Sequence, residues 1–282
     1  MKPKNLFLAQ PKYFWACVRT LSENIGYSKR GQGRILVPTI EEMAQSFRSL
    51  ELNTHHIVGQ DGSPTELANL LHGYFSHRAD VLHHIVEPAL MDAEEARMTF
   101  TDLRKRLNPS CPLPMNKQKG EKRAEAFLTC IVNMLIEENA EGFPCNYDPR
   151  RLTTFTRDGA PVRTLARRID GAFPAVVNPI AVWELKEYYY TTTFGSRVAD
   201  GVYESLLDGM ELEELGQHEG INVKHYLIVD AYFTWWKCGK AYLCRLVDML
   251  HMGFVDEVLF GKEVITEMPR IVGEWVSELK ER

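Results

Sequence analysis

Through roughly the first hundred residues, apolar positions recur every three or four residues, which is the spacing of amphipathic helices. One predicted helical face is formed by four residues: Phe14, Val18, Leu21 and Ile25. Gly26 follows this face and is expected to end the helix. Further helix starts are predicted at Thr39, Ser63 and Asp92, because a glutamate three positions after each completes a capping box. The N-terminal part is therefore expected to be helical.

A proline-rich segment at residues 108–114 interrupts this pattern, since its three prolines exclude a helix interior. We expect a helical region over residues 1–115, serving recognition or dimerisation, and a separate catalytic core over residues 116–282. The second region opens with a wide apolar stripe that predicts a helix over residues 120–139. The stripe consists of Ala124, Phe127, Leu128, Ile131, Val132, Leu135 and Ile136.

Strand patterns follow. Residues 153–169 are predicted to form a hairpin around Asp158-Gly159, a favoured turn pair. Residues 180–186 form a mostly apolar run, typical of a strand buried on both faces. A second apolar strand is predicted over residues 223–229, and a short edge strand over residues 255–260.

Two helices complete the predicted fold. The first begins at Ser196 and turns four residues toward the core: Val198, Val202, Leu206 and Met210. Glu204 and Asp208 would then face elsewhere. The last helix is expected to begin at Thr266, with Pro269 in its first turn. The order helix, hairpin, strand, helix, strand, helix predicts an α/β (α+β) fold with a mixed β-sheet sandwiched by helices.

Composition mainly excludes classes of protein. The 282 residues are 45% hydrophobic and 25% charged, as in an ordinary globular protein, and the net charge of −5 does not indicate a nucleic-acid binder. Local basic stretches nevertheless occur. The six cysteines form no C-x-x-C pair and the histidines have no metal-binding spacing, so no zinc site is predicted. Because there is no signal peptide and no membrane-spanning run, we expect a cytoplasmic protein without a membrane partner.

Charged residues near the end of the strand at residues 180–186 carry the main functional signal. Glu184 and Lys186 are two positions apart, so they share one face of the strand. Asp170 lies fourteen positions before Glu184, and the intervening turn is expected to place the two carboxylates side by side. Two carboxylates and a lysine at the mouth of a sheet suit a hard divalent cation such as Mg²⁺.

This pattern of Asp170 followed by Glu184-Leu185-Lys186 resembles the D…ExK signature of the PD-(D/E)XK nucleases, a superfamily that includes many type II restriction endonucleases. The residue before Asp170 is isoleucine, whereas the motif has proline there. The resemblance covers roughly the last 160 residues, the length of one domain. It also extends to the order of elements, because the superfamily core is helix, three strands, helix, strand.

The resemblance implies a Mg²⁺-dependent DNA endonuclease that leaves 5′-phosphates. Asp170 and Glu184 would hold the metal, with the backbone carbonyl of Leu185 as a further ligand, and Lys186 would activate the attacking water. In several branches of the superfamily an acid on the first helix reaches the metal, so Glu125 is a candidate; a solvent-facing acid near a helix start is the alternative. A twofold homodimer is expected on double-stranded DNA, in a prokaryotic system with a cognate methyltransferase.

Four basic residues are candidates for DNA contact. Lys29, Arg30 and Arg34 lie in a glycine-rich loop without apolar pattern, and Arg197 lies in the first turn of the helix that follows the motif. For the loop, a flexible connector is an equal alternative.

Two other functions fit the same residues. One is a phage-defence or repair nuclease of the same fold, and the other is a non-catalytic DNA-binding subunit.

Overall fold

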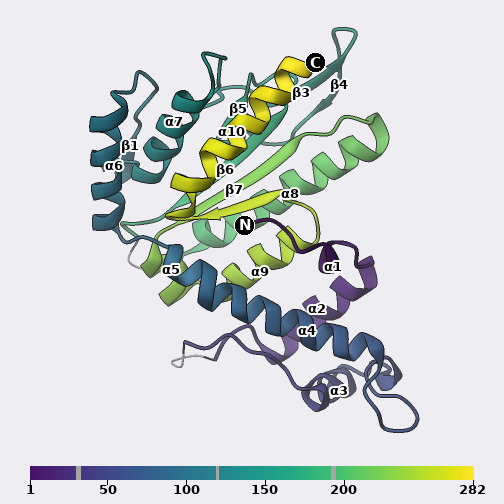
Figure 1. Ribbon diagram of the computed structural model, residues 1–282. Helices are drawn as coiled ribbons and strands as arrows, with labels where there is room; N and C mark the ends of the chain where they lie inside the picture. The colour runs from purple at the N-terminus through teal and green to yellow at the C-terminus, as the bar shows by residue number, and fades with distance from the viewer. Residues whose placement is uncertain (30–32, 119–120, 192–194) are drawn as a thin grey trace.

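In the described part of the chain, a mixed sheet of four strands lies at the centre, in the order β5–β6–β7–β8 (Figure 1). β5 (Gly171–Phe173) runs antiparallel to β6 (Ala181–Glu187), whereas β7 (Lys224–Asp230) and β8 (Glu257–Phe260) continue parallel to β6. The computed structural model describes residues 1–29, 33–118, 121–191 and 195–282. Only the backbone is described for residues 117, 118, 121–123 and 197.

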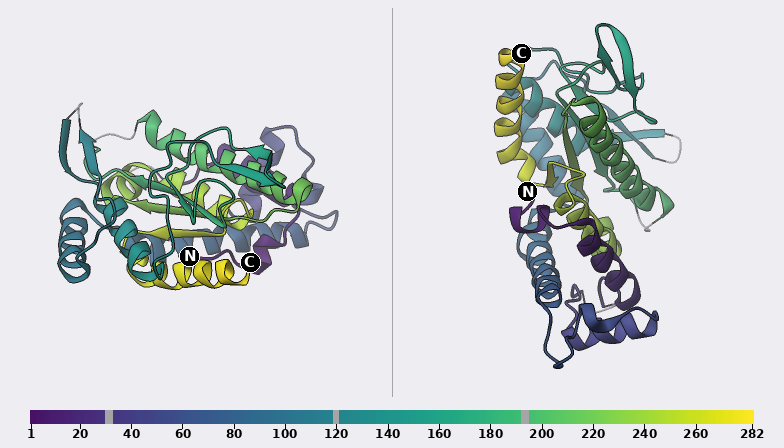
Figure 2. Two further views of the ribbon diagram at one scale, coloured as in Figure 1. Left: turned by 90° about the horizontal axis from the view of Figure 1, so that it is seen from above. Right: turned by 90° about the vertical axis from the view of Figure 1, so that its right-hand side faces the viewer.

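Helices cover both faces of the sheet (Figures 1 and 2). On one face lie α7 (Phe127–Asn139) and α10 (Glu263–Glu281), and on the other lie α8 (Ser196–Glu219) and α9 (Lys240–His251). The chain thus has the mixed α/β architecture that the sequence predicted, with helices on both sides of a sheet.

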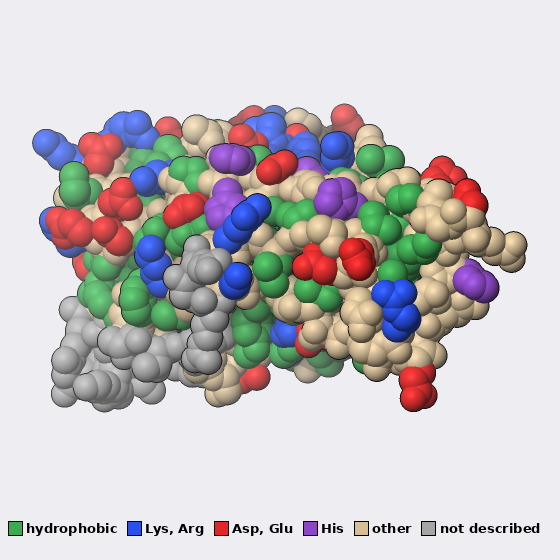
Figure 3. Space-filling view, turned by 90° about the horizontal axis from the view of Figure 1, so that it is seen from below, with side chains coloured by type: hydrophobic (Ala, Val, Ile, Leu, Met, Phe, Trp, Pro, Cys, Tyr) green, Lys and Arg blue, Asp and Glu red, His purple; other side chains and the backbone are tan. Residues whose placement is uncertain are grey.

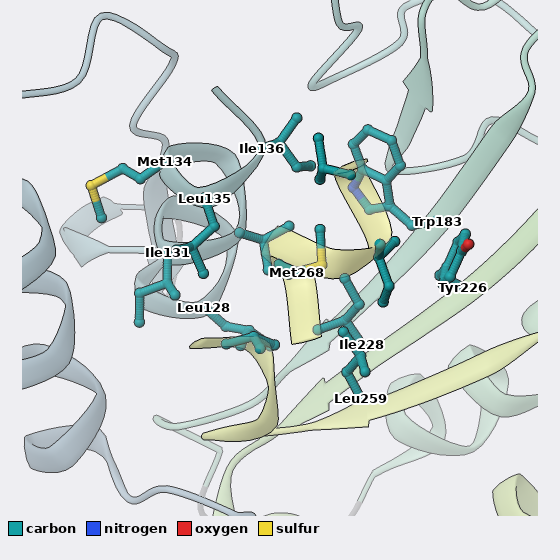
Figure 4. Close-up of a cluster of buried hydrophobic side chains, with 14 of the residues drawn as sticks. Leu128, Ile131, Met134, Leu135, Ile136, Trp183, Tyr226, Ile228, Leu259 and Met268 are labelled. Carbon is teal, nitrogen blue, oxygen red and sulfur yellow. The ribbon is translucent and has the colours of Figure 1, made fainter. Parts of the chain in front are cut away.

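The two faces of β6 have different environments because side chains alternate along a strand. Trp183 points toward α7 and α10, where its ring stacks on Trp275 with the centroids 5.5 Å apart (Figure 4). Val182, on the opposite face, packs with residues of α8. Glu184 and Lys186 have the same parity as Val182, so they also face α8, as their spacing predicted.

The N-terminal part is helical, as expected. Its elements are α1 (Asn5–Leu8), α2 (Lys12–Ile25), α3 (Ile40–Ser49), η1 (Thr54–His56), α4 (Glu66–Val81), η2 (Leu82–Val86), α5 (Glu87–Ala89) and α6 (Ala93–Leu107). Its helices up to α5 lie at the α9 side of the sheet, whereas α6 packs on α7 (Figures 1 and 2). The capping boxes at Thr39 and Asp92 are confirmed, and Gly26 ends α2 with φ of 104°. The predicted start at Ser63 is wrong by two residues, because Thr65 caps α4 instead.

A buried ion pair fastens the N-terminal helices to the core. Nη1 of Arg78 on α4 lies 3.0 Å from Oδ2 of Asp248 on α9, and the Tyr74 hydroxyl donates to the same carboxylate at 2.5 Å. All three side chains are almost fully buried. Because breaking a buried pair is strongly destabilising, this contact holds the helical part against the sheet layer. The described helices include none with the length and apolar composition needed to cross a lipid bilayer.

Two hairpins flank the core. β3 (Thr154–Arg157) and β4 (Ala160–Thr164) confirm the predicted hairpin, and Asp158 and Gly159 both have the positive φ that this turn requires. They form a sheet of their own, apart from the central one. β1 (Met115–Gln118) and β2 (Glu121–Glu125) form the other hairpin, so the prediction of one helix over residues 120–139 is wrong at its start. The continuous apolar stripe begins only at Phe127, where α7 begins.

Helix boundaries in the second half also differ from the prediction. Gly195, and not Ser196, is the N-cap of α8, and α10 begins at Glu263, three residues before the predicted Thr266. Pro269 therefore lies inside α10, beyond its first turn. The remaining short element is η3 (Phe233–Cys238), between β7 and α9.

The contact between His77 and His251 leads us to expect a lower free energy of unfolding in acid. Nε2 of His77 lies 3.2 Å from Nε2 of His251, and burial, followed by the charge of His251, lowers the pKa of His77 to about 4. A lowered histidine pKa stabilises the fold above the unfolded-state pKa and loses that contribution as pH falls toward the folded pKa. We expect about 1 kcal/mol of unfolding free energy to be lost between pH 7 and 5, allowing for solvent access to the ring. Urea titrations of wild type and His77→Gln test this, and an equal pH dependence in both would contradict it.

Candidate active site

Asp170 stands at the start of β5, directly beside β6. Its Oδ2 accepts the Leu185 backbone N–H at 2.8 Å, and its own N–H donates to Oε1 of Glu184 at 3.2 Å. Gly171 makes this approach possible, because a Cβ there would lie 2.0 Å from the Trp183 ring. The predicted juxtaposition of Asp170 and Glu184 is confirmed.

Lys186 completes the predicted group of three. Its Nζ lies 2.7 Å from Oε2 of Glu184, and the side chains are 8% and 0% exposed. An exposed edge-strand ion pair, the ordinary reading of an E-x-K sequence, is therefore excluded. In a strand, the N–H and C=O of one residue point to the same edge. The Leu185 carbonyl thus faces the Asp170 side, where β5 has no partner residue for it.

Three further charged residues join the group, and sequence reasoning did not place them there. Nη1 of Arg167 lies 2.9 Å from Oε1 of Glu184 and 2.6 Å from Oδ2 of Asp208, while its Nη2 lies 3.3 Å from Oε2 of Glu204. The same Glu204 oxygen is 3.3 Å from Lys186 Nζ. Glu204 and Asp208 are one turn apart on α8, and Asp208 is fully buried.

The predicted core face of α8 is wrong in part, because the helix turns a side with glycine, serine and aspartate toward β6. Met210 is 52% exposed, whereas Gly201, Ser205, Asp208 and Gly209 face inward. The two glycines allow the close approach: a Cβ on Gly201 would lie 3.1 Å from Lys186 Cδ, and one on Gly209 would lie 2.3 Å from a backbone oxygen. A helix that buries small residues brings its acids next to β6.

Protonation in this group is uneven. Burial, and next the Glu184 carboxylate, raise the pKa of Asp170 to about 6 and that of Asp208 to about 7. Burial opposes the ionisation of Glu184, but Lys186 and Arg167 outweigh it and lower the Glu184 pKa. Burial likewise disfavours the Lys186 cation, but Glu184 and Asp170 outweigh it and raise the Lys186 pKa. Lys186 therefore keeps its proton at neutral pH.

The donor set fits a divalent cation. Four carboxylates, those of Asp170, Glu184, Glu204 and Asp208, face only two cations in this group. Oδ1 of Asp208 is buried without a hydrogen-bond partner, which marks a position where positive charge is lacking. Among the described residues, no three or more His, Cys, Asp or Glu side chains converge as a ready-made metal site. Oxygens of Asp208 and Glu184 contact Arg167 and Lys186 instead. One or two carboxylates with water and phosphate oxygens are a usual Mg²⁺ environment.

Comparison with known families divides the chain in two. Residues 91–275 match the model of a domain of unknown function (DUF7687), which covers more than half of the chain. The chain belongs to this family. Residues 1–85 match a second domain of unknown function (DUF7690). No curated protein and no solved structure matches the chain.

All six charged residues of the group lie within the DUF7687 region. The predicted division after residue 115 stays a prediction, although the DUF7687 match begins earlier and α6 packs on α7 in one core. Glu125 ends β2 in this region and lies 3.8 Å from Arg104. None of its described contacts involves Asp170, Glu184 or Lys186. The prediction that Glu125 lies on a helix is wrong, because it lies in β2.

The basic candidates lie elsewhere. Lys29 and Arg34 are exposed in the DUF7690 region, where the Lys29 N–H donates to the Arg34 carbonyl at 3.1 Å. Arg197 is the second residue of α8, and its side chain is not described. Arg30 lies outside the described residues.

Arg167 gives a stability prediction for the DUF7687 region. Replacing it with methionine leaves the buried Glu184 and Asp208 carboxylates without this partner, which we expect to cost about 3–5 kcal/mol of unfolding free energy. Arg163→Met is the matched control, because Arg163 makes a comparable contact to Glu214 of α8, 3.1 Å long but more exposed. The control is expected to cost about 0–1 kcal/mol. Equal losses in urea titrations of the two variants would contradict the assignment of Arg167 to a buried network.

Proposed function

We propose that this protein is a Mg²⁺-dependent DNA endonuclease of the type II restriction kind, with a PD-(D/E)XK-like core. The observation that carries the proposal is the group formed by Asp170, Glu184 and Lys186. Glu184 is hydrogen-bonded both to the Asp170 backbone N–H and to the Lys186 ammonium, which supports the interpretation of these residues as the D…ExK signature. Between α7 and α8 the chain forms β3, β4, β5 and β6, but the predicted hairpin β3–β4 lies outside the central sheet. The strands of the central sheet and the helices that cover it follow in the order α7, β5, β6, α8, β7, and this part of the order supports the same proposal.

Each residue has a role in this proposal. Asp170, Glu184 and the Leu185 carbonyl would hold Mg²⁺, which when bound supplies a water of lowered pKa and neutralises phosphate charge. Because Lys186 keeps its proton, we assign it to hydrogen bonding with the attacking water and to stabilising charge on the phosphate, rather than to proton removal. Glu204 reaches the Lys186 ammonium and positions it.

The contacts of Arg167 are the observation that favours the alternative of a non-catalytic subunit. Its guanidinium occupies Glu184, Glu204 and Asp208 together, an arrangement suited to a stable structural network. In a non-catalytic DNA-binding subunit, this group of charges would have only that structural role. The balance of charges favours the nuclease, because four carboxylates share only two cations, those of Arg167 and Lys186.

The chemistry of the products tests the proposal. Linear fragments made in Mg²⁺ should be joined by DNA ligase without prior phosphorylation, since hydrolysis at the 3′ oxygen leaves a 5′-phosphate. Sequencing the ends of the fragments distinguishes a restriction enzyme from a defence or repair nuclease. One repeated sequence at every end supports restriction and a homodimer with a partner methyltransferase, whereas scattered ends support a defence or repair nuclease.

A further inference from the structure

A basic groove lies beside the site, where the DUF7690 region meets η3 and α9. It encloses about 950 Å³, within the range of ligand-sized pockets. Four cations line it, two from the N-terminal loop (Lys29 and Arg34) and two from the η3–α9 segment (Lys237 and Lys240). Figure 3 shows the lower face of the molecule, on which lysine, arginine and histidine side chains lie among acidic ones.

The positive charge of the groove is only partly compensated by the protein. Among the described residues, none of the four cations forms an ion pair, and the carboxylate lining the groove is that of Glu87. Some other cations of the chain are paired: Arg270, for example, contacts three glutamates. An excess of positive charge in one hollow is unexpected for a chain of net charge −5, and it creates a local field that attracts anions.

Two of the cations are held in place by aromatic rings. Lys240 Nζ lies 4.3 Å from the centre of the Trp236 ring and donates to the Trp236 carbonyl. Lys237 Nζ lies 5.3 Å from the centre of the Tyr232 ring. The Ile35 N–H donates to Nε2 of His83 at 3.4 Å, which ties the loop to η2. The cations therefore project from a built surface, which lowers the entropy cost of ligand binding.

The segment η3, which forms part of the groove, also contacts the strand that carries the candidate site. Nε1 of Trp235 in η3 donates to the Lys186 carbonyl at 3.4 Å, and the Thr234 hydroxyl donates to the Tyr188 carbonyl at 3.0 Å. Thus η3 packs against the end of the strand that carries Glu184 and Lys186, while its next residues line the groove.

We propose that this groove binds the phosphodiester backbone of DNA, with Lys29 and Arg34 on one wall and Lys237 and Lys240 on the other. Four cations on two walls suit repeated phosphates, which need positive charges rather than base-specific contacts. The choice of DNA as the strand rests on the nuclease proposal, whereas the capacity for phosphate rests on the groove alone. Sequence reasoning identified only one wall.

Two double variants test the two walls independently: Lys29→Ala/Arg34→Ala and Lys237→Ala/Lys240→Ala. Binding of a fluorescent DNA duplex is measured by anisotropy over a range of salt in a chelator, so that no cleavage is needed. Each double variant should weaken binding about tenfold and reduce the slope of log affinity against log salt by about two. Lys280→Ala/Arg282→Ala is the matched control at the far end of α10 and should bind like wild type.

The outcomes are distinct. Unchanged affinity and salt slope in both double variants would overturn the proposal, as would a failure of wild type to bind the duplex. Poly-glutamate competing as well as DNA of equal charge would overturn the phosphate assignment. Weakened binding by both variants supports the groove even if the protein does not cut DNA, so failure of the nuclease proposal is distinguishable.

Discussion

Asp170→Asn is expected to lower the single-turnover rate of DNA cleavage in Mg²⁺ by about a hundredfold or more, because losing one electrostatic contact at a reacting centre costs about 10²–10³ in rate. The substitution keeps the shape of the side chain, and the amide oxygen can still accept the Leu185 N–H. What it removes is the negative charge that would hold the cation. Glu184→Gln should have the same effect on cleavage, with a larger loss of stability, because Glu184 is paired with Arg167 and Lys186.

Asp256→Asn is the matched control for Asp170→Asn. Asp256 accepts the His225 backbone N–H at 2.8 Å, the same distance and the same kind of contact on the same sheet, but at the other end of the strands. It should cleave like wild type. Cleavage by Asp170→Asn at the rate of the Asp256→Asn control would show that Asp170 has no role in the reaction.

Lys186→Ala should abolish cleavage while keeping most of the affinity for DNA. In this account the Lys186 ammonium acts where charge develops in the transition state, so its loss affects the rate more than the ground-state complex. Stability alone cannot decide the question, because Lys186 is buried and its loss leaves Glu184 with one cation fewer. The separation of cleavage in Mg²⁺ from DNA binding in Ca²⁺ is the informative measurement.

Lys186→Arg sharpens this test because it keeps the charge. It should melt closer to wild type than Lys186→Ala and still fail to cleave, since a planar guanidinium cannot replace a compact ammonium beside Gly201. Full activity in either variant would remove Lys186 from the reaction. Loss of DNA binding together with a collapse of the melting temperature would instead make it a structural residue.

The core of the site could be predicted because local rules determine it. Glu184 and Lys186 are two positions apart in a strand, so both side chains point to one face. The turn after β5 brings β5 back along β6, and Gly171 allows the close approach that places Asp170 beside Glu184. Arg167 could not be found in this way. It lies between β4 and β5, in a segment without periodicity, and only the tertiary fold brings it to α8.

The acids of α8 were misplaced for a different reason. A hydrophobic pattern assigns Val198, Val202, Leu206 and Met210 to the core, but close packing against Lys186 and Phe254 favours the glycine side of the helix. Small residues give no hydrophobic signal, although the spacing of Gly201 and Gly209 is the clue that was present. The prediction of a helix start near residue 120 was also wrong. Residues 121–125 are charged and only weakly apolar, and they pair as a strand with residues 115–118 instead of joining the helix.

The central claim is tested most directly by incubating the purified protein with supercoiled plasmid DNA, with Mg²⁺ and with a chelator, beside the Asp170→Asn and Asp256→Asn variants. The account predicts linear or nicked plasmid from wild type and from Asp256→Asn in Mg²⁺ alone, and intact plasmid from Asp170→Asn. Cleavage that persists in the chelator, or that Asp170→Asn retains at the wild-type rate, would contradict it.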